Sequence, residues 1–134
     1  MNLKTKVADS EKITINMGFV DLGQIDLLVS EGFYGNRTDF IRTAIRNQLS
    51  NHADAVKQVV ARKTLVLGLQ HFSADDLRAV KAAKQMLNIR VLGLATIADD
   101  VSPALALATI ASIDVLGALH ASAAVKAALE SRLR

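Results

Sequence analysis

The segment EKITINMGFVDLGQIDLLVSEGFYGNRTDFIRTAIRNQL, residues 11–49, carries the clearest secondary-structure signals in the N-terminal part of this chain. In residues 11–17 apolar and polar side chains alternate, which is the period of a half-buried β-strand. The apolar set is Ile13, Ile15 and Met17, and the polar set is Lys12, Thr14 and Asn16. A lone strand cannot satisfy its backbone or bury one face, so it needs a partner strand from elsewhere.

Two helical segments follow this strand. Asp21 is the expected N-cap of the first helix, and Gly32 is placed to end it in a left-handed conformation. The apolar face of the first helix consists of Leu22, Ile25, Leu28 and Val29.

The second helix is expected to begin after the turn Phe33-Tyr34-Gly35. Asn36 is its expected N-cap, and Asp39 stands where a capping box has Glu or Gln. Its apolar stripe consists of Phe40, Ile41, Ala44, Ile45 and Leu49. No Gly or Pro follows before Gly68, so this helix either runs on through Val60 or restarts at Ser50.

The order strand, helix, helix in residues 11–50 resembles the ribbon-helix-helix family of Arc, MetJ and CopG type. The most specific segment is EGFYGNRTDFIRTAIRNQL, residues 31–49, which is similar to the family's turn and second helix. The strand KITIN, residues 12–16, is similar to its ribbon. The sequence Gly18-Phe19-Val20 departs from the family's more usual Leu-Pro after the strand, which leaves the strand end open.

The resemblance implies a dimer in which two copies pair their strands antiparallel and insert this ribbon into the major groove of DNA. The outward side chains Lys12, Thr14 and Asn16 would contact bases, because Lys suits guanine and Asn suits adenine. The shared dimer core would consist of Ile13, Ile15, Met17, Phe40, Ile41 and Ile45.

DNA phosphates are expected at the start of the second helix, where free N–H groups and the helix dipole favour anions. In the family this helix end clamps the DNA backbone, and the role carries over to Asn36, Arg37 and Thr38. Residues 1–10 are expected to form a flexible basic arm whose Lys4 and Lys6 add phosphate contacts.

The second half of the chain contains an internal repeat. The tripeptide Val-Leu-Gly begins at Val66, Val91 and Val115, with spacings of 25 and 24 residues. Each copy has the pattern of a strand, a turn and a helix, and the second copy signals its helix by Ser102 as N-cap and Pro103 at the first helical position. Asp75-Asp76 and Asp99-Asp100 precede two of these helices and are interpreted as helix-capping acids.

Units of this size must stack to bury their apolar faces. The sequence therefore predicts an α+β chain. Residues 11–50 form the ribbon-helix-helix, residues 51–63 a helical connector, and residues 64–134 a small βα solenoid with three parallel strands. Natural solenoids cap their ends, and no evident cap follows the last copy. Val115, Leu116, Val125 and Leu129 are therefore predicted to form an oligomerisation surface near an unpaired strand edge.

Composition excludes several classes of function. The chain has no Cys, so disulfides and thiolate metal sites are absent, and His71 and His120 lie too far apart along the repeat to favour metal sensing. No catalytic motif is present, so neither enzymatic activity nor a cofactor or metal is expected. No segment predicts a signal peptide or membrane span, which favours a cytoplasmic protein.

These observations predict a homodimer that binds specific double-stranded DNA, with assembly to tetramers or larger oligomers through the repeats. Transcriptional repression is the favoured role. One alternative is a relaxosome, partition or DNA-organising accessory protein. Another is an antitoxin whose C-terminal half binds a protein partner. Residues 1–50 carry six basic and six acidic residues, so the net charge of +3 lies in the second half and by itself does not indicate DNA binding.

Overall fold

The computed structural model describes residues 10–134. The chain divides into two compact units, with the boundary between Asn51 and His52. The predicted basic arm with Lys4 and Lys6 lies outside the described residues, except for Ser10. No helix in the described part of the chain is both long enough and apolar enough to cross a membrane.

Within its described residues, 10–51, the N-terminal unit contains two helices, α1 at Phe19–Ser30 and α2 at Arg37–Asn51. Helix α1 begins two residues before Asp21, with Gly18 as its N-cap, so the prediction of Asp21 as N-cap is wrong. Asp21 lies instead in the first turn, where its carboxylate still interacts favourably with the helix dipole. Gly32 has a φ of 84°, as predicted for the residue that ends this helix.

The second unit opens with helix α3 at Ala53–Lys63, so the chain restarts a helix after α2 instead of continuing it. Strands β1 at Val66–Phe72, β2 at Leu87–Ile97 and β3 at Ile110–His120 then alternate with helices α4 at Ala74–Ala82, α5 at Pro103–Thr109 and α6 at Ala123–Ala128. A short 3-10 helix, η2, follows at Glu130–Arg132.

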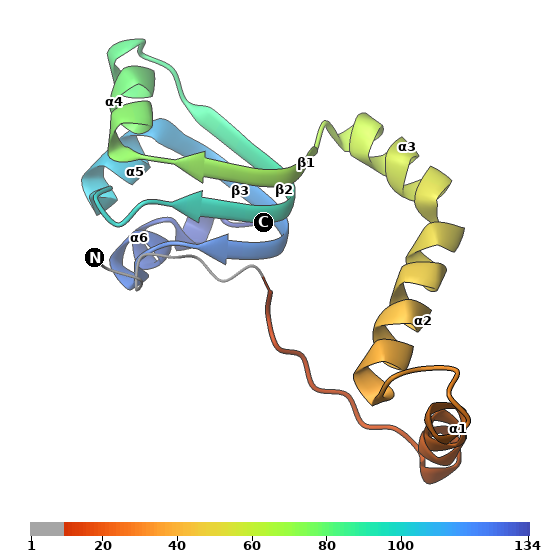
Figure 1. Cartoon of the computed structure of the whole chain (residues 1–134). Coiled ribbons are helices and arrows are strands. Elements are labelled where there is room, and N and C mark those ends of the chain that lie inside the picture. The colour runs from red at the N-terminus through yellow and green to blue at the C-terminus, as the bar shows by residue number, and fades with distance from the viewer. Residues whose placement is uncertain (1–9) are drawn as a thin grey trace. The chain divides into compact units, whose positions relative to one another are not determined.

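The three strands form one parallel sheet in the order β1-β2-β3 (Figure 1). Their register places Val66 beside Val91 and Val91 beside Val115. The Val-Leu-Gly repeat found in the sequence is thus also a structural repeat, since equivalent residues of successive copies are neighbours across the sheet.

Helices α4, α5 and α6 lie along one side of this sheet (Figure 1). The hydrophobic core of the unit lies between the sheet and these three helices. The buried residues of β2 are mainly every second residue, and β3 adds Ile113 to the same face. The helices contribute Leu77 from α4, Ala106 from α5 and Val125 from α6.

Two of the residues predicted for the oligomerisation surface belong to this core. Val125 and Leu129 are each only 1% exposed, because they pack under the sheet next to β3. The free edge of β3 is also shorter than expected, since Leu133 bridges Ile113 in parallel and the Arg134 N–H donates to the Ile113 carbonyl at 2.8 Å. We therefore correct the predicted surface and remove Val125 and Leu129 from it.

Serine caps begin all three repeat helices. The hydroxyls of Ser73, Ser102 and Ser122 each accept a backbone N–H from the first turn of α4, α5 and α6. Asp76 completes a capping box with Ser73, as interpreted from the sequence, and hydrogen bonds from the Ser73 backbone N–H and the Ser73 side chain lower the pKa of Asp76. Asp100 acts differently, because it accepts the Ala74 N–H at the start of the neighbouring helix α4.

The glycine of each Val-Leu-Gly repeat adopts a backbone conformation that other residues avoid. Gly68, Gly93 and Gly117 have φ values of 120°, 140° and 121°. A Cβ on Gly93 would lie 2.1 Å from the Gly68 carbonyl oxygen, whereas a Cβ on Gly68 would meet nothing within 4 Å. The repeat therefore requires glycine for its backbone conformation at all three positions and for close strand approach at the second and third.

We expect Gly93→Ala to destabilise the second unit much more than Gly68→Ala. Both substitutions impose the same backbone strain, about 1–3 kcal/mol, but only the first adds a clash with backbone. Urea unfolding followed by circular dichroism measures the difference. Equal losses of unfolding free energy in the two variants would contradict the close approach of the strands.

Candidate nucleic-acid interface

The predicted ribbon, residues 11–17, forms neither helix nor strand in the single chain. Its apolar side chains are largely exposed, at 71% for Ile13 and 59% for Ile15. Lys12, Thr14 and Asn16 are exposed as well. One copy of the chain thus leaves both faces of the segment in solvent, and the predicted split into a core face and a base-contacting face remains a prediction.

The helices of the N-terminal unit also leave apolar side chains in solvent. Phe40 and Ile41 of α2 are half-buried and Ile45 is exposed. Ile25 is the one buried residue among residues 10–51. The large exposed apolar side chains of α1, the turn and α2 are Phe19, Val20, Leu27, Phe33, Ile45 and Leu49. An isolated chain therefore gives this unit almost no core.

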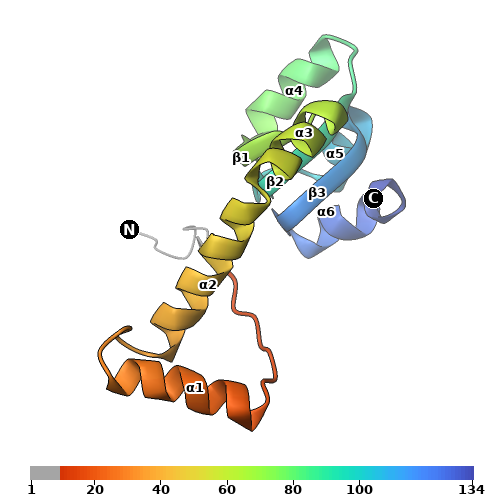
Figure 2. The same cartoon turned by 90° about the vertical axis from the view of Figure 1, so that its right-hand side faces the viewer.

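The loop that joins α1 to α2 (Figure 2) is held by local hydrogen bonds. The Asn36 Oδ1 atom accepts the Asp39 N–H at 2.7 Å, which confirms Asn36 as the N-cap. The Asp39 carboxylate accepts the Gly35 N–H at 2.9 Å, one residue earlier than a capping box would place it. Tyr34 and Phe40 add an edge-to-face contact with ring centroids 5.0 Å apart.

An ion pair joins α1 to the start of α2. The Arg37 Nε and Nη2 atoms donate to the two carboxylate oxygens of Asp26, each at 2.8 Å. These hydrogen bonds lower the pKa of Asp26 and raise that of Arg37. The Arg37 guanidinium, which was predicted to contact phosphate, is thus held by the Asp26 carboxylate. The backbone N–H groups of Arg37 and Thr38 lie in the first turn of α2, where a bound anion is favoured.

Comparison with known protein families supports the resemblance found in the sequence. Residues 8–126 match the model of the Ribbon-Helix-Helix transcriptional regulator family. The chain belongs to this family. No curated protein and no solved structure matches it. The family match extends well beyond residues 11–50, where the sequence resemblance was found, and includes most of the repeat unit of this ribbon-helix-helix regulator.

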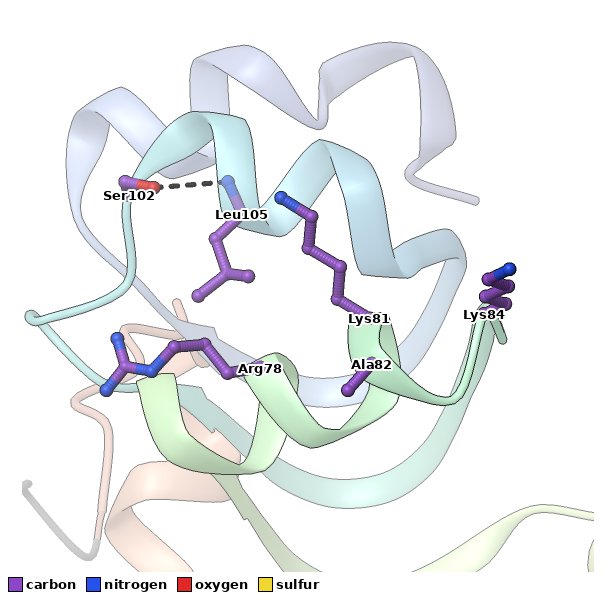
Figure 3. Close-up of a pocket in the computed structure, with 6 residues that line it drawn as sticks. All are labelled: Arg78, Lys81, Ala82, Lys84, Ser102 and Leu105. Atoms are coloured by element: carbon purple, nitrogen blue, oxygen red, sulfur yellow. Dashed lines mark hydrogen bonds between the residues drawn. The ribbon is translucent and has the colours of Figure 1, made fainter.

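The repeat unit of this ribbon-helix-helix chain has a basic groove between α4 and α5, with a volume of about 680 Å³ (Figure 3). Arg78, Lys81 and Lys84 line it together with Ala82, Ser102 and Leu105. Arg78 pairs with Asp75 at 2.6 Å. Within residues 10–134 no carboxylate lies within 4.0 Å of the Lys81 or Lys84 ammonium. The same residues contain no cluster of three potential ligands for a metal ion.

Sequence reasoning missed Asp26 and this basic groove. Asp26 and Arg37 are separated by 11 residues and a turn, so no helical spacing links them in the sequence. The surplus of basic residues in the second half did indicate a cationic surface there, but the charge count could not show that Arg78, Lys81 and Lys84 share one groove.

Asp26→Asn tests whether Arg37 can contact phosphate. Because the substitution frees the guanidinium, we expect tighter DNA binding and a salt dependence steeper by about one phosphate contact. Affinity is measured by fluorescence anisotropy at several salt concentrations.

Asp21→Asn is the matched control, since it removes the same charge from α1 and Asp21 forms no ion pair with the described residues. If the two variants bind DNA with the same affinity and salt slope, Arg37 is not a phosphate contact.

Proposed function

We propose that this ribbon-helix-helix regulator is a homodimeric, sequence-specific DNA-binding repressor. The observation that carries the proposal is the exposed apolar surface of the N-terminal unit, including Ile13 at 71% and Phe19 at 92%. A second copy that pairs its strand with residues 11–17 would bury this surface and satisfy the strand backbone together. Membership of a family of DNA-binding regulators supports the same assembly.

In this dimer the paired strands form a two-stranded ribbon that fits the major groove. Lys12, Thr14 and Asn16 face the bases. The backbone N–H groups at the start of α2 hold a DNA phosphate on either side of the ribbon, and Arg37 reaches a phosphate when it leaves Asp26. Such a dimer at a promoter blocks polymerase by occupancy and needs no catalytic group or cofactor.

The repeats are proposed to join dimers, so that neighbouring DNA sites fill cooperatively.

A second candidate function, DNA organisation without regulation of a particular gene, is favoured by one observation. The groove cations Lys81 and Lys84 lack carboxylate partners among the described side chains, and such cations suit sequence-independent phosphate contacts. Mapping the bound DNA across the genome separates a few operators from long tracts.

Ile15→Asp in the full chain tests the dimer. A carboxylate on the predicted core face would be buried without a partner, so we expect loss of the dimer and of DNA binding, with the repeat unit still folded. Sedimentation and circular dichroism measure both.

Thr14→Asp is the neighbouring control, because Thr14 is predicted to face outward. It should keep the dimer and lose DNA affinity. A dimeric Ile15→Asp variant would contradict the assignment of the two strand faces.

Base recognition is tested by Asn16→Ala. We expect a loss of about 1–3 kcal/mol at the cognate site, because a bidentate contact to adenine is removed. Binding to scrambled DNA of the same length should change little. If both DNAs lose affinity equally, Asn16 does not determine specificity.

A further inference from the structure

The face of the parallel sheet that is turned away from α4, α5 and α6 carries a cluster of leucines. Two rows that cross the strands build it. Leu67, Leu92 and Leu116 are neighbours in one row, and Leu69, Leu94 and Ala118 are neighbours in the next. We call these six residues the open leucine face.

Within residues 10–134 no element covers the outer part of the open leucine face, while Leu92, Leu94 and Ala118 are half-buried among their neighbours. Leu67 is 70% exposed, Leu69 73% and Leu116 50%. On the opposite face of the same sheet Val91 is fully buried beneath the helices. Parallel sheets occur almost only with both faces covered, so we expect this face to pack against a layer that residues 10–134 of one chain do not supply.

Polar rows bound the open leucine face at both ends of the strands. Arg90 is beside Asp114 in the register at one end. At the other end His71, Thr96 and His120 form a row, and the His71 ring shares a hydrogen bond of 2.5 Å with the Thr96 hydroxyl. An apolar centre with a polar rim is the pattern of a protein interface.

We propose that the open leucine face binds the same face of a second copy of this chain, so that two sheets stack into a sandwich. The inference rests on the dimer proposed above and identifies the surface that associates. An apolar face without charges complements an identical face, and stacked sheets interdigitate such side chains about 10 Å apart.

The area of the open leucine face indicates whether two free chains could associate through it. Two rows on three strands cover on the order of 200 Å² per copy, from strand spacings of about 4.8 Å and a rise of about 3.3 Å per residue. A stable interface between free proteins needs roughly 800 Å² per partner. The face is therefore too small to join two free chains, and it pairs when the two copies are already held together by the N-terminal dimer or on adjacent DNA sites, where effective concentrations reach the millimolar range.

The open leucine face replaces most of the surface predicted from the sequence. Leu116 belongs to both. Val115 points to the core side, and Val125 and Leu129 lie in the core. Association therefore uses the broad face of the sheet and not its edge.

Single-cysteine cross-linking tests the proposal, because the chain contains no Cys. In full-length protein we place Leu94→Cys at the centre of the face and, as a control, Ala104→Cys on the exposed helix side. With a short bifunctional maleimide, Leu94→Cys should give roughly tenfold more cross-linked chains than the control. Equal cross-linking at both positions would overturn the proposal.

A second variant separates this surface from DNA binding. Leu69→Lys, added to Leu94→Cys, should abolish the cross-link and the cooperativity on multi-site DNA, while circular dichroism and affinity for one DNA site stay unchanged. Leu107→Lys on α5, also an exposed leucine, should leave the cross-link intact. Cross-linking that persists with Leu69→Lys would overturn the proposal. If instead the unmodified chain does not bind a single DNA site, the proposed DNA-binding function is wrong.

Discussion

The N-terminal unit depends on one constraint, which is that a single chain cannot bury its own apolar side chains. In the part of the chain that the structure describes, residues 11–17 have no strand to pair with, and the two helices that follow them bury only Ile25. Small units of this kind gain stability only by sharing a core. In the proposed dimer the pairing of two strands supplies the shared core and also builds the DNA-binding ribbon, so the step that completes the fold also forms the DNA-binding surface.

The repeat unit buries apolar side chains within one chain, but only on one face of its sheet. Its helices cover one face of the sheet, and the Gly93 and Gly117 positions let each strand approach the preceding one closely. On the other face Leu67, Leu69 and Leu116 stay exposed. Both units therefore present apolar surface that a second copy can cover, and a regulator built in this way can couple DNA occupancy to association between chains.

The sequence predicted those features that follow from local periodicity and from exact repetition. The Val-Leu-Gly spacing predicted the parallel register, and Asn36 and Gly32 marked helix ends by their side-chain and backbone chemistry. Features that depend on three-dimensional neighbours were missed. Asp26 meets Arg37 only because α1 folds against α2. Val125 and Leu129 were assigned to an exposed end because no local pattern indicates that the chain's own residues 130–134 pack there.

Hydrogen exchange of the backbone amides in residues 11–17 reports whether two chains pair their strands. In the full-length protein without DNA, strand pairing should give strong protection at alternate amides of this segment, because each strand is hydrogen-bonded to the partner's strand. The protection should disappear together with the dimer on dilution. Exchange at the rate of an unstructured peptide, at concentrations where the protein is dimeric, would show that residues 11–17 do not form the dimer's ribbon.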